Sequence, residues 1–297
     1  MTLSDPARSA QGDRQVLVNL GCGRIWHAAW HNLDRQPRPP HVRALDVRQR
    51  LPFADNSVDA VYHSHLLEHL SRPQAQVLML ECCRVLRPNG VVRVATPDLE
   101  AMARQYLASL ETAASGGDTF LYDWMTLLLY DQAVRERRGG EMTETIARST
   151  SSQRALASAW MDASLEPGTE ASRALQMLQR SPREFAAAVR RRMPSPRDVV
   201  VDAAVRLTGG RRALAQMRLG RFRSSGEVHL WMYDRYSLCR LLERCGFADP
   251  VTTQAGESRI AGFADYALEV RDGRILKPDS LYVEGTKIRA TAGSPRR

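Results

Sequence analysis

The stretch Val16-Leu17-Val18-Asn19-Leu20-Gly21-Cys22-Gly23 runs from an apolar, strand-like segment directly into two closely spaced glycines. A lone acid, Asp34, closes the next short apolar run. In an open parallel sheet, ligands bind beyond the carboxyl ends of the strands, where glycines let them approach the backbone and a strand-end acid accepts hydrogen bonds from ribose. The pattern therefore predicts a site for a cofactor that carries a nucleoside.

Two common nucleotide-binding motifs do not fit this stretch. The dinucleotide motif G-x-G-x-x-G needs a third glycine, where this chain has Trp26. A Walker phosphate loop needs Gly-Lys-Ser or Gly-Lys-Thr after its glycines, and that is absent here. Nicotinamide-dependent redox chemistry stays open as an alternative, weakened by Trp26.

Hydrophobic periodicity predicts an α/β fold built on a mostly parallel sheet. The links between the first three predicted strands are too short for full helices, so we expect one flank of the sheet to be thinly covered. Helix-like stretches with Gly/Ser breaks and no clear strands indicate a helical insertion over 108–225. The predicted strands are 15–20, 31–34, 42–45, 58–63, 91–96, 250–254 and 264–270, and the predicted helices of the sheet domain are 73–86, 98–107 and 233–245.

Further motifs follow the glycine turn in a fixed order: Asp46 ahead of Leu51-Pro52-Phe53, then Glu68-His69-Leu70, then Arg84-Val85-Leu86-Arg87-Pro88-Asn89-Gly90. With Asn19–Gly23 and Asp34, they resemble class I S-adenosylmethionine-dependent methyltransferases of the type 11 subgroup over about residues 15–107. The resemblance resumes at 226–288, where His229–Asp234, Gly246-Phe247 and Lys277–Tyr282 are similar to bacterial members associated with surface-polysaccharide synthesis. It implies a Rossmann-like sheet, S-adenosylmethionine as cofactor and methyl transfer.

The resemblance also assigns cofactor-binding roles. Gly21, Cys22 and Gly23 are expected to lie against the methionine part of the cofactor, because a Cβ at either glycine would collide with it. Asp34 is the expected ribose ligand, and Asn19 holds a position that is usually acidic. The other expected pocket residues are Asp46 at the adenine edge, Val47 beside the ring, Ser64 and His65. The alternatives are a plain tight turn for the glycines, a surface acid for Asp34 and a loop cap for Asp46.

The string His65-Leu66-Leu67-Glu68-His69 allows a metal site, because residues at i, i+3 and i+4 share one face of a helix. It also matches an H-x-x-E-H metalloprotease pattern. The surrounding motifs favour a different interpretation, in which His65 lines the cofactor pocket and Glu68 and His69 make structural hydrogen bonds. We therefore predict no metal.

Methyl transfer requires mainly that acceptor and methyl group be aligned, and a hydroxyl acceptor also needs a base. Asp98, just past the fifth predicted strand, and His229 are the candidate catalytic residues. Each has a structural alternative, Asp98 as a helix N-cap and His229 as a packed core residue. Trp231 and Tyr233 could stack on a sugar or aromatic acceptor, or pack in the core.

Composition limits the compartment and the partners. The 297 residues contain no apolar run near the roughly 18 residues that span a bilayer, and Met1–Arg14 lacks the apolar core of a secretory signal. Five cysteines without a CxxC pair indicate reduced thiols, so we expect a cytoplasmic protein. The net charge of +9 is concentrated in residues 183–223, which hold eleven arginines against three acids. That segment is a solvated helical face or a surface for nucleic acid, anionic membrane or a phosphorylated substrate.

The sequence thus predicts a methyltransferase domain over 15–107 and 226–288, with 108–225 as a basic helical cap on the acceptor side. Residues 1–14 and 289–297 are expected to be a flexible N-terminus and a disordered tail. The predicted reaction is transfer of a methyl group from S-adenosylmethionine to a small-molecule or glycan acceptor, most simply at oxygen. The alternative is a non-catalytic binding module whose basic insertion docks on nucleic acid or an anionic membrane. The oligomeric state stays open.

Overall fold

The computed structural model describes residues 15–160 and 196–288. The predicted flexible N-terminus, the predicted tail and residues 183–195 of the basic segment lie outside the described residues. The chain divides into two compact units, one made of residues 1–103 and 230–297 and the other of residues 104–229. We call them the sheet unit and the helical unit.

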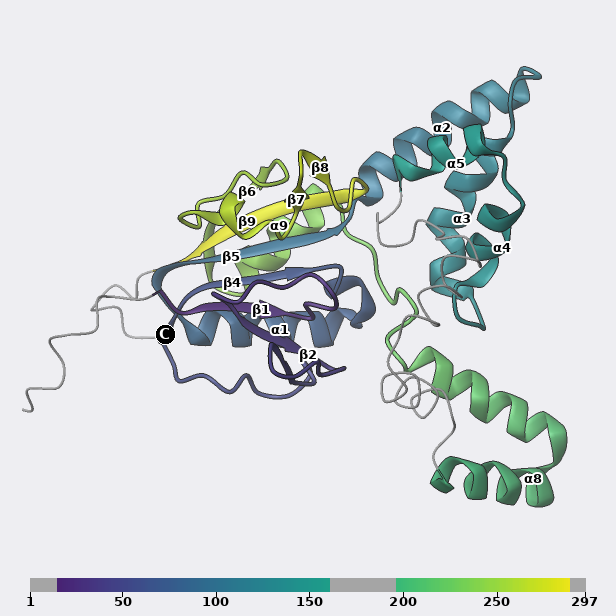
Figure 1. Cartoon of the computed structure of the whole chain (residues 1–297), viewed down its shortest axis with the longest axis horizontal. Coiled ribbons are helices and arrows are strands. Elements are labelled where there is room, and N and C mark those ends of the chain that lie inside the picture. The colour runs from purple at the N-terminus through teal and green to yellow at the C-terminus, as the bar shows by residue number, and fades with distance from the viewer. Residues whose placement is uncertain (1–14, 161–195, 289–297) are drawn as a thin grey trace, which may run out of the picture. The chain divides into compact units, whose positions relative to one another are not determined.

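The sheet unit is built on seven strands in the order β3-β2-β1-β4-β5-β9-β6 (Figure 1). Strands β1 to β5 run parallel to one another, whereas β9 is antiparallel to both of its neighbours, β5 and β6. This confirms the mostly parallel, Rossmann-like sheet. The strands are β1 (Leu17–Leu20), β2 (His31–Asp34), β3 (Val42–Ala44), β4 (Val58–Ser64), β5 (Leu86–Pro97), β6 (Phe247–Thr253) and β9 (Ser280–Lys287).

The order of the strands reverses next to β1. The chain proceeds from β1 outward to β2 and β3 and then returns to pair β4 with the other side of β1. All four residues of β1 are buried, as expected for a central parallel strand covered on both faces. A reversal of this kind opens a crevice at the carboxyl ends of the two strands, which is where open α/β sheets bind ligands.

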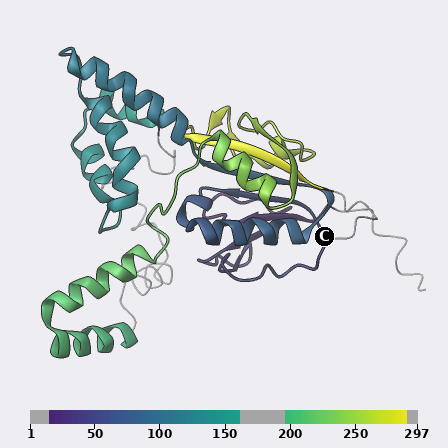
Figure 2. The same ribbon diagram turned by 180° about the vertical axis from the view of Figure 1, so that it is seen from behind.

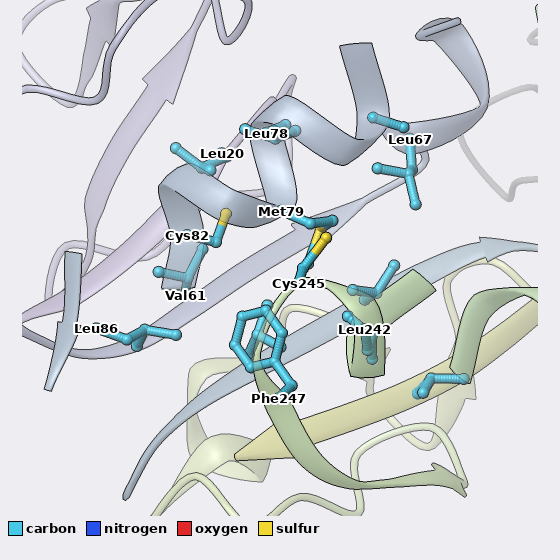
Figure 3. Packing of buried hydrophobic residues seen from close by; sticks show 14 of the residues in the cluster. Leu20, Val61, Leu67, Leu78, Met79, Cys82, Leu86, Leu242, Cys245 and Phe247 are labelled. Carbon is cyan, nitrogen blue, oxygen red and sulfur yellow. The ribbon is translucent and has the colours of Figure 1, made fainter. Parts of the chain in front are cut away.

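Two helices cover one face of the sheet: α1 (Arg72–Val85), and α9 (Arg235–Arg244), which Gly246 follows. Both begin with a reciprocal cap, in which Ser71 pairs with Gln74 and Asp234 pairs with Ser237. Figure 2 shows the two helices, blue and green, in front of the sheet. Their buried side chains meet the apolar side chains of the strands in one core (Figure 3), which includes Leu20, Val61, Leu78, Met79, Cys82, Leu242 and Phe247.

The opposite face is covered by loops, as the short links between the early strands predict. Trp30, Tyr62 and Phe263 pack edge to face there, with ring centroids 5.3 to 6.2 Å apart. Leu17 and Ala60 of the sheet and Ile260 and Leu268 of the loop after β6 complete this cluster. Aromatic rings bury large areas, so a few of them cover this face without an α-helix.

Arg93 of β5 fixes this loop layer to the sheet. Its guanidinium is fully buried and makes two hydrogen bonds to Glu269, at 2.8 and 2.6 Å, and one to Glu284 on β9 at 2.9 Å. It also donates to the carbonyl oxygens of Gln254 and Glu257, at 2.9 and 2.7 Å. We call Arg93, Glu269 and Glu284 the buried ion network. It joins two strands and the loop over residues 254–269.

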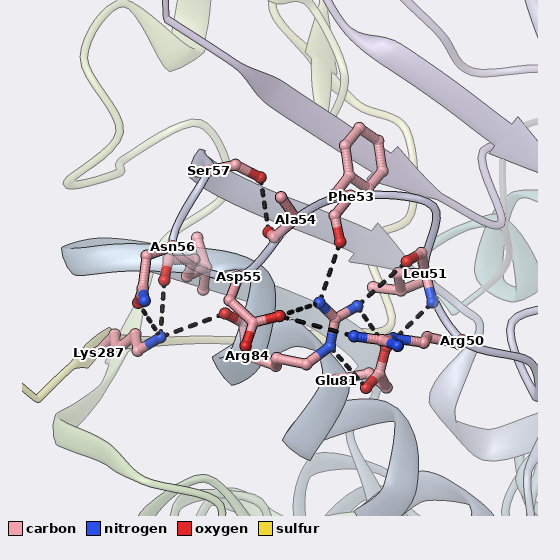
Figure 4. Close-up of polar contacts among 11 residues, drawn as sticks. Arg50, Leu51, Phe53, Ala54, Asp55, Asn56, Ser57, Glu81, Arg84 and Lys287 are labelled. Atoms are coloured by element: carbon pink, nitrogen blue, oxygen red, sulfur yellow. Dashed lines mark hydrogen bonds and ion pairs between the residues drawn. The ribbon is translucent and has the colours of Figure 1, made fainter.

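A second polar cluster surrounds Arg84 at the end of α1 (Figure 4). Arg84 is paired with Glu81 at 2.8 Å and Asp55 at 2.6 Å, and it donates to the carbonyl oxygens of Leu51 and Phe53. The hydrogen bond from Arg84, then burial, which opposes it, and the amide of Leu51 together keep the pKa of Glu81 below its usual range. The family motifs around Leu51 and Arg84 therefore serve the fold, because they fasten the loop before β4 to α1.

Three features of the sheet differ from the predictions. The strand predicted over 264–270 is wrong, because Phe263–Tyr266 is a short 3-10 helix and only Val270–Arg271 (β7) pairs, with Arg274–Ile275 (β8). The last strand of the sheet is instead β9, which was not predicted. The predicted turn over 88–90 lies inside β5, where Asn89 adopts a φ of 67°. Glu269 and Glu284 resemble surface acids in the sequence, but Arg93 makes their burial possible.

The helical unit contains no strand among its described residues, 104–160 and 196–229. Trp124, Met125 and Leu128 of α3 are buried together with Ile146 of α4. No described helix has both the length and the apolar character that crossing a bilayer requires. The helices are the continuation of α2 (Leu99–Ala114), α3 (Phe120–Val134), α4 (Gly140–Arg148), α5 (Ser151–Ser158) and α8 (Pro196–Arg223).

The part of the basic segment that the structure describes is α8. This helix is interrupted at Gly210, where φ is 74° and ψ is −173°. Arg218 and Arg221 from the second half pair with Asp202 from the first, both at 2.8 Å. Two arginines of the basic segment are therefore paired with an acid inside the helical unit.

We predict that replacing Arg93 with Met lowers the free energy of unfolding by about 3–5 kcal/mol, because two buried carboxylates lose their shared cation. Urea unfolding measures the change. The matched control is Arg87→Met, which removes a pair with Asp59 whose arginine is 44% exposed and should cost less than about 1 kcal/mol. Equal losses in the two variants would contradict the role assigned to the buried ion network.

His63 of β4 gives a pH-dependent prediction. It is fully buried, neither ring nitrogen has a hydrogen-bond partner among the described residues, and burial lowers its pKa from 6.5 to about 4. The unfolded chain therefore binds a proton that the folded chain rejects, and stability falls as the pH drops from 6.5 toward 4. The wild type should lose up to roughly 3 kcal/mol over this range relative to His63→Leu. Parallel pH profiles from urea unfolding of the two proteins would contradict this.

Candidate functional site

The register of the parallel strands brings the predicted site residues to one edge. Leu20, which precedes Gly21, is opposite Leu33 on β2 and His63 on β4. Asp34 is in turn opposite Ala44, two residues before Asp46. The segments that follow these strands, with Gly21–Gly23, Asp34, Asp46–Val47 and Ser64–His65, therefore share the carboxyl edge at the point where the strand order reverses.

The glycine turn adopts backbone angles that favour glycine: φ is 60° at Gly21 and 54° at Gly23. A Cβ on Gly21 would lie 2.8 Å from a methyl of Leu66, whereas a Cβ on Gly23 would have no protein atom within 4 Å. Both glycines were predicted for the same reason, room for the cofactor. In the structure Gly21 is favoured by its backbone angle and by the close packing of Leu66, whereas Gly23 is favoured by its backbone angle and has open space where a Cβ would lie.

Asp34 holds the glycine turn against β2. One carboxylate oxygen accepts a hydrogen bond from the Gly23 amide at 2.9 Å, and the other accepts one from the Gln36 amide at 2.7 Å. The guanidinium of Arg38 donates to the carbonyl of Gly23 from the other side. Each carboxylate oxygen has two lone pairs, so these bonds leave Asp34 further capacity to accept hydrogen bonds.

The hydrogen bonds of Asn19 explain why this chain has an amide at a position that is usually acidic. Its side chain is buried, and its amide nitrogen donates to the carbonyl of Ile25 and to Oδ1 of Asn32, both at 3.2 Å. Asn32 in turn donates to the carbonyl oxygens of His27 and Trp30, both at 2.9 Å. The two amides therefore fix the loop that follows the glycine turn, a task that needs donors and that a carboxylate cannot perform.

Asp46 and Val47 follow β3. The Leu45 amide donates to the carbonyl of Asp34 at 2.9 Å, which joins this segment to the end of β2. Asp46 pairs with Arg48 at 2.5 Å, and this hydrogen bond lowers the pKa of Asp46 to about 2. Its carboxylate is therefore ionised at neutral pH. Asp46 also accepts a hydrogen bond from the backbone amide of Arg48, which is the loop cap predicted as the alternative to a role at the adenine. Val47 packs against the core.

His65 lies at the end of β4 with a φ of 50°, which is uncommon for a residue other than glycine. Its Nε2 is 2.8 Å from Oγ of Ser280 and 3.9 Å from a carboxylate oxygen of Asp279, and its Nδ1 is 3.6 Å from Oε1 of Glu68. Asp279 and Ser280 were not predicted as neighbours of this edge. The signal available was their place in the Lys277–Tyr282 motif.

Glu68 is fully buried, and burial raises its pKa. Its Oε2 accepts a hydrogen bond from Thr96 at 3.3 Å, and its backbone carbonyl accepts from the amides of Leu230 and Trp231 at 2.7 and 3.2 Å. His69 approaches Glu68 at 4.0 Å. His65 and His69 thus both approach one carboxylate oxygen of Glu68, while the backbone of Glu68 anchors the segment that leads to α9.

A small cavity of about 20 Å³ lies beside the glycine turn. The hydroxyl of Tyr62 is buried and has no hydrogen-bond partner among the described residues. Burial, followed by the charge of Asp34, raises the pKa of the Cys22 thiol to about 12, so Cys22 is neutral and is not a nucleophile. The lining residues are Asn19, Gly21, Cys22, Ile25, Tyr62, Ser64 and Lys277.

The two candidate bases belong to different units. Asp98 follows β5 in the sheet unit and caps α2, since its Oδ1 accepts the Ala101 amide at 3.1 Å, and burial raises its pKa. His229 belongs to the helical unit, where its side chain is buried and its backbone amide donates to the carbonyl of Gln132 at 2.9 Å. Both structural alternatives, the cap and the buried histidine, are therefore observed.

Comparisons with known proteins identify this domain. Residues 18–94 match the family model described as a methyltransferase domain, of type 11. A probable S-adenosylmethionine-dependent methyltransferase of Mycolicibacterium smegmatis is 47% identical over 66 residues. Residues 18–94 carry a class I S-adenosylmethionine-dependent methyltransferase domain. The aligned part is 20% of this chain and 25% of that relative, so the chain spans about a quarter of the length of the relative it matches.

Solved structures resemble this chain more distantly. A complex of the Haloferax volcanii Trm112 methyltransferase activator with a putative methyltransferase aligns over 95% of this chain and 87% of that chain, with 12% identity and a TM-score of 0.37. A methyltransferase from Archaeoglobus fulgidus aligns over 92% of this chain and 86% of that chain, with 10% identity and a TM-score of 0.36.

The edge of the methyltransferase domain fits S-adenosylmethionine. The open side of Gly23 leaves room for ligand atoms, and Asp34 retains lone pairs for ribose hydroxyls. The buried Tyr62 hydroxyl, without a partner among the described residues, offers a hydrogen bond at the cavity beside the turn. Because an unsatisfied buried hydroxyl is costly, a polar ligand at that cavity would relieve the cost.

We predict that Asn19→Asp lowers the free energy of unfolding of the methyltransferase domain by about 1–3 kcal/mol, because it removes two donors and leaves two oxygen acceptors facing a carboxylate. Chemical unfolding measures the loss. The matched control is Asn56→Asp, an exposed residue whose Oδ1 already accepts from Lys287 at 2.7 Å, and it should change stability by less than about 0.5 kcal/mol. A neutral Asn19→Asp would contradict the role of the amide pair.

Proposed function

We propose that this chain transfers the methyl group of S-adenosylmethionine to a hydroxyl of a small-molecule or glycan acceptor. The observation that carries the proposal is the glycine turn held by Asp34 at the switch point of the sheet, with Gly23 open toward a ligand. The match of residues 18–94 to a methyltransferase domain supports it. The association with polysaccharide synthesis rests on the motif resemblance alone and is part of the proposal.

The cofactor, when bound, supplies a methyl group already activated on a sulfonium. Asp34 would accept hydrogen bonds from the ribose hydroxyls, and the ionised Asp46 and Val47 would hold the adenine. Gly21–Gly23 would hold the aminoacyl part, together with Ser64 and His65 at the end of β4. The chain thereby fixes the donor so that the acceptor can approach in line, which is a proximity effect.

Asp98 is the base that we propose for a hydroxyl acceptor. It follows β5 at the same carboxyl edge, and burial raises its pKa, which makes its carboxylate a better proton acceptor. Capping α2 uses lone pairs of one oxygen and does not prevent proton uptake by the carboxylate. His229 is the second candidate for this role.

Trp231 favours a glycan-type acceptor. Its side chain is 42% exposed, and its backbone amide is bonded to the carbonyl of Glu68, which places it next to the segment of His65. The guanidinium of Arg72 lies 4.7 Å from the centre of its ring. Tyr233, in contrast, is buried in the core, so its ring is used for packing. An exposed indole offers an apolar face on which a sugar ring can stack.

The experiment incubates the purified chain with S-adenosylmethionine and with small-molecule and glycan fractions, and detects methylation by mass spectrometry. We predict an acceptor that gains the mass of one CH₂ group. Gly23→Asn should lower the rate at least about tenfold, since asparagine tolerates a positive φ but its side chain fills the open side of the turn.

The matched control is Gly273→Asn, at a glycine with a φ of 73° and no protein atom within 4 Å of a built Cβ, in the turn between β7 and β8. It should leave the rate unchanged. A Gly23→Asn protein as active as the wild type would remove the turn from the cofactor site. A chain that binds S-adenosylmethionine and methylates no fraction would favour the non-catalytic alternative.

A further inference from the structure

We propose that Lys277 binds the carboxylate of the cofactor's aminoacyl group, with the hydroxyl of Tyr62 as a second hydrogen-bond donor. This inference rests on the proposed function and specifies how the site holds the part of the cofactor next to the glycine turn. Lys277 lies in the segment before β9, far from the glycine turn in the sequence, and its motif carries no assigned role.

Lys277 reaches the glycine turn through the small cavity. It lines this cavity together with Gly21 and Cys22 of the turn, and its Nζ lies 3.5 Å from the carbonyl of Ser64 at the end of β4. Among the described residues that line the cavity, Lys277 is the one with a charged side chain. A cation thus lies at the switch point, next to the backbone on which the aminoacyl group is expected.

None of the other lining side chains carries a negative charge, and the charge of Lys277 also acts on the buried carboxylate of Glu68. Because position 19 carries an amide whose nitrogen already serves Ile25 and Asn32, this side chain supplies no negative charge for an ammonium. The Cys22 thiol is neutral. Burial raises the pKa of Tyr62 well above its ordinary value, so its hydroxyl keeps its proton and can donate it. One cation and one buried donor match a carboxylate, which only accepts hydrogen bonds.

The backbone of Lys277 is held by the buried ion network. The hydroxyl of Tyr282 donates to the carbonyl of Lys277 at 3.1 Å, and the preceding amide, of Leu276, donates to the carbonyl of Glu269 at 2.8 Å. Arg93 binds the carboxylate of Glu269 and lies 5.4 Å from the centre of the Tyr282 ring. Such support positions a binding residue before its ligand arrives, which lowers the cost of binding.

The choice of lysine is itself informative. The chain has 42 basic residues of the lysine and arginine types, and only Lys277 and Lys287 are lysines. A compact ammonium suits a cavity of about 20 Å³ better than the planar fork of arginine does. Because a cavity of that size holds roughly one water molecule, the aminoacyl group enters only as the lining moves, and the flexible stem of Lys277 allows such a movement.

Calorimetry with two ligands tests the inference. S-adenosylhomocysteine has the aminoacyl group, and 5′-methylthioadenosine has the same nucleoside without it. We predict that Lys277→Met weakens binding of S-adenosylhomocysteine by about tenfold or more and leaves binding of 5′-methylthioadenosine unchanged. Tyr62→Phe should show a smaller loss with the same selectivity. The control Lys287→Met, at a lysine bonded to Asn56 and to the carbonyl of Leu86, should bind both ligands like the wild type.

Each other outcome overturns the inference in a distinguishable way. Unchanged binding of S-adenosylhomocysteine by Lys277→Met would remove the lysine from the site. An equal loss for both ligands would assign Lys277 a structural role, and thermal unfolding of the variant would show the matching loss of stability. A wild-type chain that binds neither ligand would overturn the proposed function, and this inference with it.

Discussion

The buried ion network of Arg93, Glu269 and Glu284 is the interaction on which the rest of the sheet unit depends. One face of the sheet has no α-helix over it among the described residues, and the loop after β6, with its short 3-10 helix at Phe263–Tyr266, covers it. Arg93 lies opposite Glu284 in the β5–β9 register and binds both carboxylate oxygens of Glu269 in the loop. The backbone amide of Gly256 donates a second hydrogen bond to Oε2 of Glu269, and the amide of Arg259 donates to Oε2 of Glu284. Buried charges are tolerated because each is both paired and hydrogen-bonded.

The same network links the fold to the proposed cofactor site. Through Glu269 and Tyr282 it holds the segment of Lys277, which lines the cavity beside the glycine turn. Two distant residues therefore lie beside the turn. Asp34 on β2 accepts a hydrogen bond from a turn amide, and Lys277 from the loop before β9 lines the adjacent cavity. The site combines residues from the first and the last segments of the sheet unit. It therefore needs the loop layer to be folded before it can bind a ligand.

The sequence was sufficient wherever the determinants were local. The apolar run before Gly21 predicted β1, and the caps at Ser71 and Asp234 accompany helices whose periodicity was clear. The predictions failed where the role of a residue depends on a partner that is distant in the sequence. The strand predicted over 264–270 was wrong and β9 was missed, and the burial of Glu269 and Glu284 depends on Arg93, which is distant from both in the sequence. Likewise, Asn19 resembles a weakened cofactor ligand until Asn32 and the carbonyl of Ile25 are seen beside it.

The most direct test of the account is hydrogen–deuterium exchange of the full chain with and without saturating S-adenosylhomocysteine. The account predicts slower exchange at the amides of Gly21–Gly23 and of Ser64–His65, because a ligand at the carboxyl edge shields the turn and the end of β4. Unchanged exchange at these amides, at a ligand concentration that saturates binding, would contradict the claim that this edge of the sheet holds the methyl donor.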